Sequence, residues 1–246
     1  MRNILLLILT VAHIEALAFE KVSFKSADGV LVTADLHLTT RAEAPLILMF
    51  HQAGWSRGEY LELAPTFNRL GYHCLVVDLR SGNLVNGIRN ETAKDAQRLM
   101  KQVSYLDAYQ DVRAAWSYTC SRFPNTGKIL FGSSYSASLV LMLGAELDGA
   151  LQAVVAFSPG EYFRGVVKDD QYVTNRSSLV NIPTFVGCAN NEQQSCKAIF
   201  DAIAAETKTF YYPTETTGNH GAKALFTKYS DHKEYWSALL QFLSTL

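Results

Sequence analysis

The sequence lacks an excess of charge of either sign. Its 22 lysines and arginines nearly balance 23 aspartates and glutamates, and charged residues make up only 18% of the chain. The basic residues are scattered and form no stripe that could follow a phosphate backbone, and there is no acidic tail. Nucleic acid is therefore not expected as a partner.

Long apolar runs are missing beyond the first residues. Arg2 is followed by an apolar run from Ile4 to Ala12, which at roughly ten residues is shorter than the ~20 that span a membrane. The tripeptide Ala16-Leu17-Ala18 then has the small-x-small pattern of a signal-peptidase site, so residues 1–18 are predicted to be a signal peptide cleaved after Ala18. The alternative is an uncleaved anchor. We expect an exported protein, periplasmic or secreted, without stable membrane insertion.

Cysteine is scarce, with four residues in the whole chain. None of the four has the paired C-x-x-C spacing of a zinc site, so no metal is expected. Cys188 and Cys196 lie eight positions apart around a loop, and an oxidising compartment would permit a disulfide between them. Two buried free thiols are the alternative.

Internal repeats, low-complexity tracts and linkers are also lacking, which favours one domain over residues 19–246. Short apolar runs alternate with helical patterns, and this predicts an α/β fold with a mostly parallel sheet covered by helices on both faces. A hairpin of strands 21–25 and 30–38 is expected first. About six strands follow, at 45–50, 72–79, 128–131, 154–157, 182–187 and 208–212. Helices are expected at 59–70, in two pieces within 91–119, at 134–147 and at 234–246.

One segment interrupts this alternation. Residues 160–181 show little periodicity and carry polar clusters such as Asp169-Asp170. Irregular segments of this length within a compact domain are often functional. We therefore predict that residues 160–181 form a small lid.

The segment KILFGSSYSAS, residues 128–138, is a buried strand that runs directly into a turn and then an apolar helix. A serine in a sharp strand-to-helix turn holds its hydroxyl out from the sheet edge, and the residues two positions away on either side must be small. Gly132 and Ser136 meet this requirement around Ser134, although glycine is usual at the second position. Ser134 is the predicted nucleophile, and three neighbouring serines leave competing registers open.

An oxyanion formed by attack of Ser134 needs amide donors. The amide of Tyr135 lies at the N-terminus of the following helix and is the first predicted donor. The second should come from the loop after strand 45–50, which reads HQAGWSRG from residue 51. Ala53 is the predicted donor there, with Gln52 as the second choice. His51 ends the strand and is expected to brace this loop.

The general base is expected in the segment Gly218-Asn219-His220-Gly221. His220 lies there in a glycine-flanked loop between a strand and the last helix, where an imidazole can reach a serine hydroxyl and take its proton near neutral pH. His232 is the alternative, but it lies at the start of the last helix and is expected to face solvent.

The acid is expected in the loop CANNEQ that follows strand 182–187. Asn190 and Asn191 stand where aspartate is usual, and a neutral amide would stabilise an imidazolium poorly. Glu192 is the first carboxylate within reach and is the predicted acid. Glu161, which follows the preceding strand, is the alternative.

Together these segments resemble the α/β-hydrolase fold and, within it, the dienelactone-hydrolase-like group. The resemblance extends over nearly all of residues 19–246. It implies a Ser-His-acid triad in the chain order nucleophile, acid, histidine, no cofactor, and action on carboxylic esters or lactones. Dienelactone hydrolases proper use a cysteine nucleophile, so their substrate is not carried over. The segments that carry the resemblance are His51-Gln52-Ala53-Gly54, Asp78-Leu79-Arg80-Ser81-Gly82, Gly132-Ser133-Ser134-Tyr135-Ser136 and Gly218-Asn219-His220-Gly221.

The sequence thus predicts a serine hydrolase of carboxylesterase type that forms an acyl-enzyme with a small-molecule ester or lactone. A hydrolase-fold binding protein without turnover is one alternative. An acyltransferase or a peptidase using the same three residues is another, because fold alone does not separate these activities. The aromatic residues expected either in an acyl pocket or in the core are Trp55, Tyr60, Tyr162 and Phe163.

Overall fold

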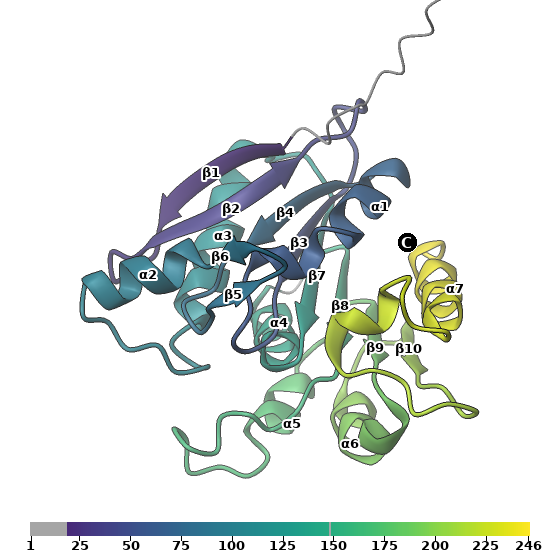
Figure 1. The fold of residues 1–246 in the computed structure, drawn as a ribbon. Coiled ribbons are helices and arrows are strands. Elements are labelled where there is room, and N and C mark those ends of the chain that lie inside the picture. Colours follow the sequence, from purple (N-terminus) through teal and green to yellow (C-terminus); the bar gives the residue numbers. More distant parts are fainter. Residues whose placement is uncertain (1–18, 148) are drawn as a thin grey trace, which may run out of the picture.

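Eight strands form one sheet in the spatial order β1-β2-β4-β3-β7-β8-β9-β10 (Figure 1). They are β1 (Phe19–Lys25), β2 (Leu31–His37), β3 (Leu46–Phe50), β4 (His73–Val77), β7 (Lys128–Ser133), β8 (Ala153–Phe157), β9 (Thr184–Gly187) and β10 (Lys208–Tyr211). β2 pairs antiparallel with both of its neighbours, and the other adjacent strands pair in parallel. This confirms the predicted α/β arrangement.

The computed structural model describes residues 19–147 and 149–246. The predicted signal peptide, residues 1–18, lies outside the described residues. Within the described ranges, no helix is both long and apolar enough to cross a membrane.

Helices cover both faces of the sheet, so the central strands are apolar along their whole length instead of alternating with polar residues. On one face lie α3 (Tyr109–Arg122), α4 (Tyr135–Glu146) and α6 (Gln193–Ala202), and on the other lie α1 (Leu63–Arg69) and α7 (His232–Leu243) (Figure 1). β3 shows the division, because Leu46, Leu48 and Phe50 pack into one apolar cluster and Ile47 and Met49 into the other.

Two predicted helices differ in detail from the structure. The segment predicted as one helix over 59–70 consists of a 3-10 helix, η1 (Arg57–Tyr60), followed by α1, and the Ser56 hydroxyl caps η1 by accepting from the Gly58 amide. The helical region 91–119 does form two pieces, α2 (Glu91–Arg98) and α3. The polar loop before α2 contains a short hairpin of β5 (Leu84–Val85) and β6 (Ile88–Arg89). Strands of two residues are too short to show an alternation of apolar and polar positions in the sequence.

The segment 160–181 connects β8 to β9. It contains an irregular loop and one short helix, α5 (Tyr172–Ser177), which packs against α4 and α6. Glu161 holds this helix in place, because its carboxylate accepts hydrogen bonds from the amides of Val173 and Thr174 and from the Thr174 hydroxyl, each at 2.8 Å. The segment is thus a structured layer, and its role as a lid stays a prediction.

The candidate disulfide between Cys188 and Cys196 is not formed, and the alternative of two buried free thiols is correct. Cys188 directly follows β9 and Cys196 lies on α6. The nearby Cys188 thiol and burial both raise the pKa of Cys196. The Cys196 thiol also lies 3.3 Å from the Pro159 carbonyl oxygen, to which it donates.

A buried arginine fixes the loop that follows β3. Arg57 bonds the Asp78 carboxylate through its backbone amide and through Nη1, both at 2.7 Å, and its Nε lies 2.9 Å from Asp35. All three side chains are buried. Removing one partner of a buried ion pair strongly destabilises the fold, because the charge of the other partner would stay buried without compensation. The ion network therefore holds the loop against β2 and the end of β4.

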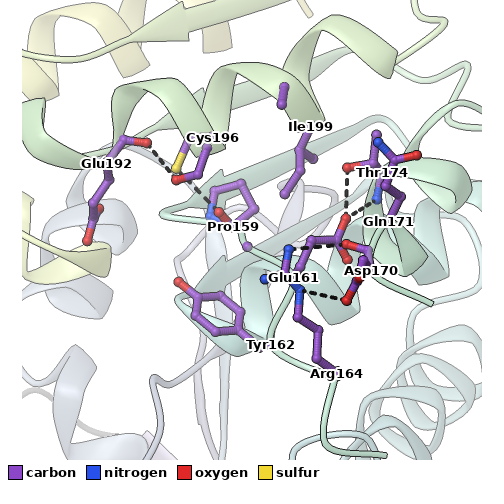
Figure 2. A pocket seen from close by; sticks show the side chains of 13 residues that line it. Pro159, Glu161, Tyr162, Arg164, Asp170, Gln171, Thr174, Glu192, Cys196 and Ile199 are labelled. Carbon is purple, nitrogen blue, oxygen red and sulfur yellow. Dashed lines mark hydrogen bonds and ion pairs between the residues drawn. The ribbon is translucent and has the colours of Figure 1, made fainter. Parts of the chain in front are cut away.

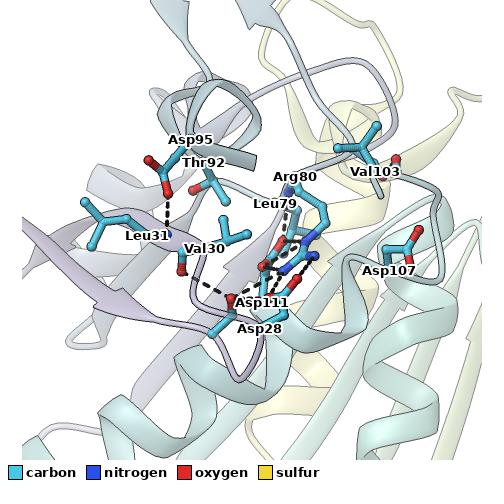
Figure 3. Close-up of polar contacts among 12 residues, drawn as sticks. Asp28, Val30, Leu31, Leu79, Arg80, Thr92, Asp95, Val103, Asp107 and Asp111 are labelled. Carbon is cyan, nitrogen blue, oxygen red and sulfur yellow. Dashed lines mark hydrogen bonds and ion pairs between the residues drawn. The ribbon is translucent and has the colours of Figure 1, made fainter. Parts of the chain in front are cut away.

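A second buried arginine holds the next loop. Arg80 donates to both oxygens of Asp111 on α3 and also to both oxygens of Asp28 in the β1–β2 turn (Figure 3). Asp78 and Arg80 belong to the motif Asp78-Leu79-Arg80-Ser81-Gly82 singled out from the sequence. The structure gives that motif a supporting role beneath the carboxyl ends of the strands.

Candidate active site

Ser134 occupies the turn between β7 and α4. Its backbone has φ 61° and ψ −125°, a conformation that residues other than glycine rarely adopt and that concentrates at functional sites. The Ser134 amide donates to the Phe157 carbonyl oxygen at 2.8 Å, which ties the turn to the end of β8. The strained turn holds the Ser134 hydroxyl at the carboxyl edge of the sheet.

The residues two positions from Ser134 have different tasks. A Cβ atom on Gly132 would lie 2.5 Å from the Ser136 carbonyl oxygen, so only glycine fits there. Ser136, which replaces the usual glycine, is fully buried and accepts from the Ser133 amide at 2.8 Å. Its hydroxyl donates to the Phe50 carbonyl oxygen at 2.7 Å. The unusual serine therefore links the turn to the end of β3.

Ser134, His220 and Glu192 form one chain of hydrogen bonds. The Ser134 hydroxyl lies 2.8 Å from Nε2 of His220, and Nδ1 of His220 is hydrogen-bonded to Oε1 of Glu192. With the proton on Nδ1, the ring donates to Glu192 and accepts from Ser134. The structure thus brings together the three residues predicted as nucleophile, base and acid.

Glu192 is held as a carboxylate. Burial raises its pKa, but hydrogen bonds from His220 and Ser158 outweigh burial, and the pKa of Glu192 is lowered overall. The Ser158 hydroxyl donates to Oε2 at 2.7 Å, and the Ala189 amide reaches the same oxygen at 3.3 Å. An ionised Glu192 can orient the imidazole and stabilise its protonated form.

Ser158 also holds the loop that carries the histidine. Its hydroxyl oxygen accepts from the Gly221 amide at 2.9 Å, next to His220. Ser158 has φ 55°, again in the left-handed region. Sequence reasoning missed this residue, because a serine before Pro159 at the end of a strand resembles any turn residue.

Two backbone amides beside Ser134 are available to an anion. Phe50 pairs with Gly132, which places the loop after β3 next to the Ser134 turn. Within residues 19–147 and 149–246, the amides of Ala53 and Tyr135 have no hydrogen-bond acceptor. The Gln52 amide, the second choice from the sequence, is already bonded to Glu59 at 2.7 Å. Ala53 and Tyr135 therefore remain the predicted donors to an oxyanion, because their amides are not used elsewhere.

The other candidate residues lie elsewhere. Glu161 caps α5 and is not bonded to His220. His51 is fully buried. Its Nε2 accepts a hydrogen bond from the Leu79 amide at 2.9 Å, and its Nδ1 lies 2.8 Å from the Gln52 carbonyl oxygen. Burial lowers the pKa of His51 to about 4, so the ring is neutral and braces the loop as expected. His232 is the first residue of α7, with Nδ1 2.7 Å from the Tyr229 carbonyl oxygen.

A small apolar cavity adjoins the Ser134 turn. Its volume is about 240 Å³, and its lining residues are Val103, Ser104, Tyr105, Tyr162, Phe163, Gly165 and Val166. The Tyr105 ring stacks on the Tyr135 ring with centroids 4.7 Å apart. The Tyr162 hydroxyl donates to the Ser158 carbonyl oxygen at 2.9 Å. Tyr105 and Tyr162 thus connect the cavity to Tyr135 and Ser158, which are close to Ser134 and Glu192.

Of the four aromatic residues considered from the sequence, Tyr162 and Phe163 line this cavity. Tyr60 is buried in the core, where its hydroxyl donates to the Phe50 carbonyl oxygen at 2.7 Å. Trp55 is partly buried and packs against the cluster on the opposite face of the sheet.

A second pocket of about 390 Å³ lies between α6 and the loop after β8, and Tyr162 lines it as well (Figure 2). Glu192 and Glu161 both line it, and Arg164 reaches Asp170 at its rim with Nε and Oδ1 3.6 Å apart. Within the described ranges, no cluster of three or more histidine, cysteine or acidic side chains is arranged to hold a metal ion.

Solved structures share this fold over almost the whole chain. A dienelactone hydrolase from Anabaena variabilis superposes with a TM-score of 0.65 at 16% identity, covering 92% of this chain and 95% of its own. A thermostable carboxyl esterase from Bacillus coagulans has a TM-score of 0.68 at 12% identity, covering 93% of this chain and 98% of its own. An esterase from Pyrococcus furiosus has a TM-score of 0.66 at 16% identity, covering 94% of this chain and 93% of its own. No family model and no curated protein sequence matches the chain. The chain has the α/β-hydrolase fold.

Proposed function

We propose that this protein is a serine hydrolase acting on carboxylic esters or lactones, with Ser134 as nucleophile, His220 as base and Glu192 as acid. The observation that carries the proposal is the hydrogen-bonded chain from the Ser134 hydroxyl through His220 to Glu192, with Ser134 in a strained strand-to-helix turn. The similarity in fold to esterases and to a dienelactone hydrolase supports it.

The first step transfers an acyl group to the enzyme. His220 Nε2 takes the hydroxyl proton of Ser134 while Oγ attacks the carbonyl carbon of the substrate. The carbonyl oxygen becomes an oxyanion that accepts hydrogen bonds from the Ala53 and Tyr135 amides. Glu192 stabilises the imidazolium, which then protonates the departing alkoxide. The carbon–oxygen bond to the alcohol breaks, and an ester to Ser134 remains.

The second step repeats these transfers with water. His220 accepts a proton from a water molecule, and the resulting hydroxide attacks the acyl-enzyme. Collapse of the oxyanion breaks the bond to Ser134, and the imidazolium returns a proton to the serine oxygen. A carboxylic acid leaves, and the starting protonation states are restored.

The cavity near Ser134 indicates the kind of substrate. Seven residues line it, and Val166 and Val103 expose 58% and 40% of their surface around it. Burying an apolar group there would gain about 25 cal/mol for each Å² removed from water. A volume of about 240 Å³ suits a short acyl or alkyl group. We propose esters with a short apolar substituent as the preferred substrates.

Export is proposed from the pattern of residues 1–18 alone. Cleavage after Ala18 would leave Phe19, the first residue of β1, at the N-terminus. N-terminal sequencing of the exported protein tests this.

Hydrolysis of p-nitrophenyl esters tests the proposed function. The wild-type protein should release both p-nitrophenol and the free acid, and Ser134→Ala should abolish release. Failure of the wild type to turn over any acyl or lactone substrate would favour a binding protein. Formation of a new ester in place of the free acid, when an alcohol is added at low concentration, would indicate an acyltransferase.

A further inference from the structure

Glu59 is a buried carboxyl group that the proposed reaction does not use. It lies in η1 and exposes only 1% of its surface. Its Oε2 accepts from the Gln52 amide at 2.7 Å, and its Oε1 accepts from the Ser133 hydroxyl at 2.8 Å and more weakly from Nε2 of Gln52 at 3.4 Å. Both partners are neighbours of reacting groups: Gln52 precedes Ala53, and Ser133 precedes Ser134.

The connection continues to the histidine. The Ser133 oxygen accepts from the Ala222 amide at 2.8 Å, two residues after His220. The fit is tight, because a Cβ atom on Gly221 would lie 2.6 Å from that same oxygen. Glu59 and Ser133 therefore join three segments that are distant in sequence: the loop after β3, the Ser134 turn and the His220 loop.

This arrangement mirrors the one on the other side of the histidine. There Ser158 donates to Glu192 and accepts from the Gly221 amide. The His220 loop is thus held at two successive amides, each through a serine that is bonded to a buried or half-buried carboxylate. Glu192 belongs to the hydrogen-bonded chain that ends at the Ser134 hydroxyl, whereas Glu59 contacts none of the reacting atoms.

All groups bonded to Glu59 are donors, so only its ionised form satisfies them without a conflict. Burial nevertheless raises the pKa of Glu59 to about 7, because the bonds from Gln52 and Ser133 and the nearby His220 offset burial only in part. The other titratable side chains that face it are Tyr60 and Tyr135. Within the described ranges, no salt bridge neutralises its charge.

We propose that Glu59 is a positioning residue: by holding the Gln52 amide and the Ser133 hydroxyl, it fixes the His51–Gln52 peptide and thereby directs the next amide, that of Ala53, towards the oxyanion formed on attack by Ser134. This inference rests on the proposed function. The Gln52 amide is occupied by Glu59, while the next amide along the chain is left available. Protonation or loss of the carboxylate would release this peptide and weaken the oxyanion site.

Glu59→Gln tests the proposal. The glutamine side chain has a similar shape, but its NH2 group would face either the Gln52 amide or the Ser133 hydroxyl, and both of these are donors. Removing an oxyanion donor outright lowers kcat by about 10² to 10³-fold, so misplacing one should lower kcat by about 10- to 100-fold with little change in KM. Ser133→Ala should have a similar effect. The double variant should lose little more than either single variant, because the two residues act as one unit.

The pH profile separates positioning from a general structural role. In the wild type, both His220 and Glu59 must lose a proton, so the acid limb of log kcat/KM should steepen towards a slope of about 2. In Glu59→Gln it should have a slope of about 1. Tyr60→Phe is the matched control, since it removes a buried hydrogen bond from the same 3-10 helix but leaves the bonds of Glu59 intact, and its kcat and slope should stay those of the wild type.

The outcomes are distinct. An inactive wild type refutes the proposed function. The positioning role is refuted if the wild type is active and both Glu59→Gln and Ser133→Ala keep its kcat and its slope of log kcat/KM on the acid limb. If Glu59→Gln does not fold, Ser133→Ala decides, because it leaves the buried carboxylate in place and removes both its link to the turn and the acceptor of the Ala222 amide. A tenfold or greater loss of kcat in folded Ser133→Ala, as judged by an unchanged thermal melt, supports the proposal.

Discussion

Ser158 donates its hydroxyl hydrogen to Oε2 of Glu192 at 2.7 Å, on the carboxylate oxygen that His220 leaves unoccupied. The same hydroxyl oxygen accepts from the Gly221 amide. One side chain therefore orients the acid and also holds the loop of the base. The backbone strain at Ser158, with φ 55°, is consistent with a position fixed by its surroundings.

Ser158→Ala should lower kcat/KM for ester hydrolysis by about tenfold. A hydrogen bond to a charged group contributes about 1.5–3 kcal/mol, and its loss leaves Glu192 and the His220 loop less firmly oriented. The same measurement on Ser195→Ala is the control, because Ser195 is exposed and bonds only the Glu192 carbonyl oxygen. Equal kinetics for the two variants would show that Ser158 does not orient the acid.

Glu192→Gln should lower kcat by about 10³ to 10⁴-fold, in line with the loss of the acid in related triads. Glu161→Gln should retain activity, because Glu161 is bonded to α5 and not to His220. It should instead lower the melting temperature, since it weakens three hydrogen bonds to Val173 and Thr174. Undiminished turnover by Glu192→Gln would remove Glu192 from the reaction.

Val166→Asp should raise KM several-fold for p-nitrophenyl butyrate and hexanoate and change it less for the acetate. The charged side chain would enter the apolar cavity, and each methylene group buried there gains about 0.8 kcal/mol. Leu179→Asp is the matched control, because Leu179 is 66% exposed and does not line the cavity. Identical chain-length profiles for the two variants would place the substrate elsewhere.

The stability of the fold should depend on pH through Glu59. Its pKa of about 7 in the folded state exceeds the usual 4.5, so its contribution to stability is fully present below pH 4.5 and is lost as the pH rises through 7. Over that range the loss is of the order of 3 kcal/mol. Urea unfolding at pH 5 and pH 8 should therefore show a smaller change in the free energy of unfolding for Glu59→Gln than for the wild type. The same change in both proteins would mean that the pKa of Glu59 is not raised.

Much of the architecture could be predicted from the sequence, because its signals are local. Continuous apolar strands alternate with helical periods, and this pattern predicted the class of the sheet and all eight of its strands. The motif around Ser134 and the glycines around His220 are also local. The structure places these two residues and Glu192 in contact, as the order of the motifs suggested.

The supporting residues could not be predicted, because their roles depend on contacts between distant segments. Glu59 and Ser133 are 74 positions apart, and Ser133 and Ala222 are 89 apart. In sequence, Glu59 reads as an ordinary charge at the start of a helix. The candidate disulfide could not be decided from the sequence for a similar reason: an eight-residue spacing allows Cys188 and Cys196 to meet but does not show that both are buried as thiols.

Covalent labelling by a fluorophosphonate probe shows whether Ser134 is the activated nucleophile. The probe reacts with a serine hydroxyl activated by a base, and digestion with mass spectrometry identifies the modified residue. One adduct is expected, located on Ser134 and not on Ser133 or Ser136, with no adduct on Ser134→Ala or on wild-type protein treated after heat denaturation. An unlabelled wild type, or equal labelling of Ser134→Ala, would show that Ser134 is not the activated nucleophile.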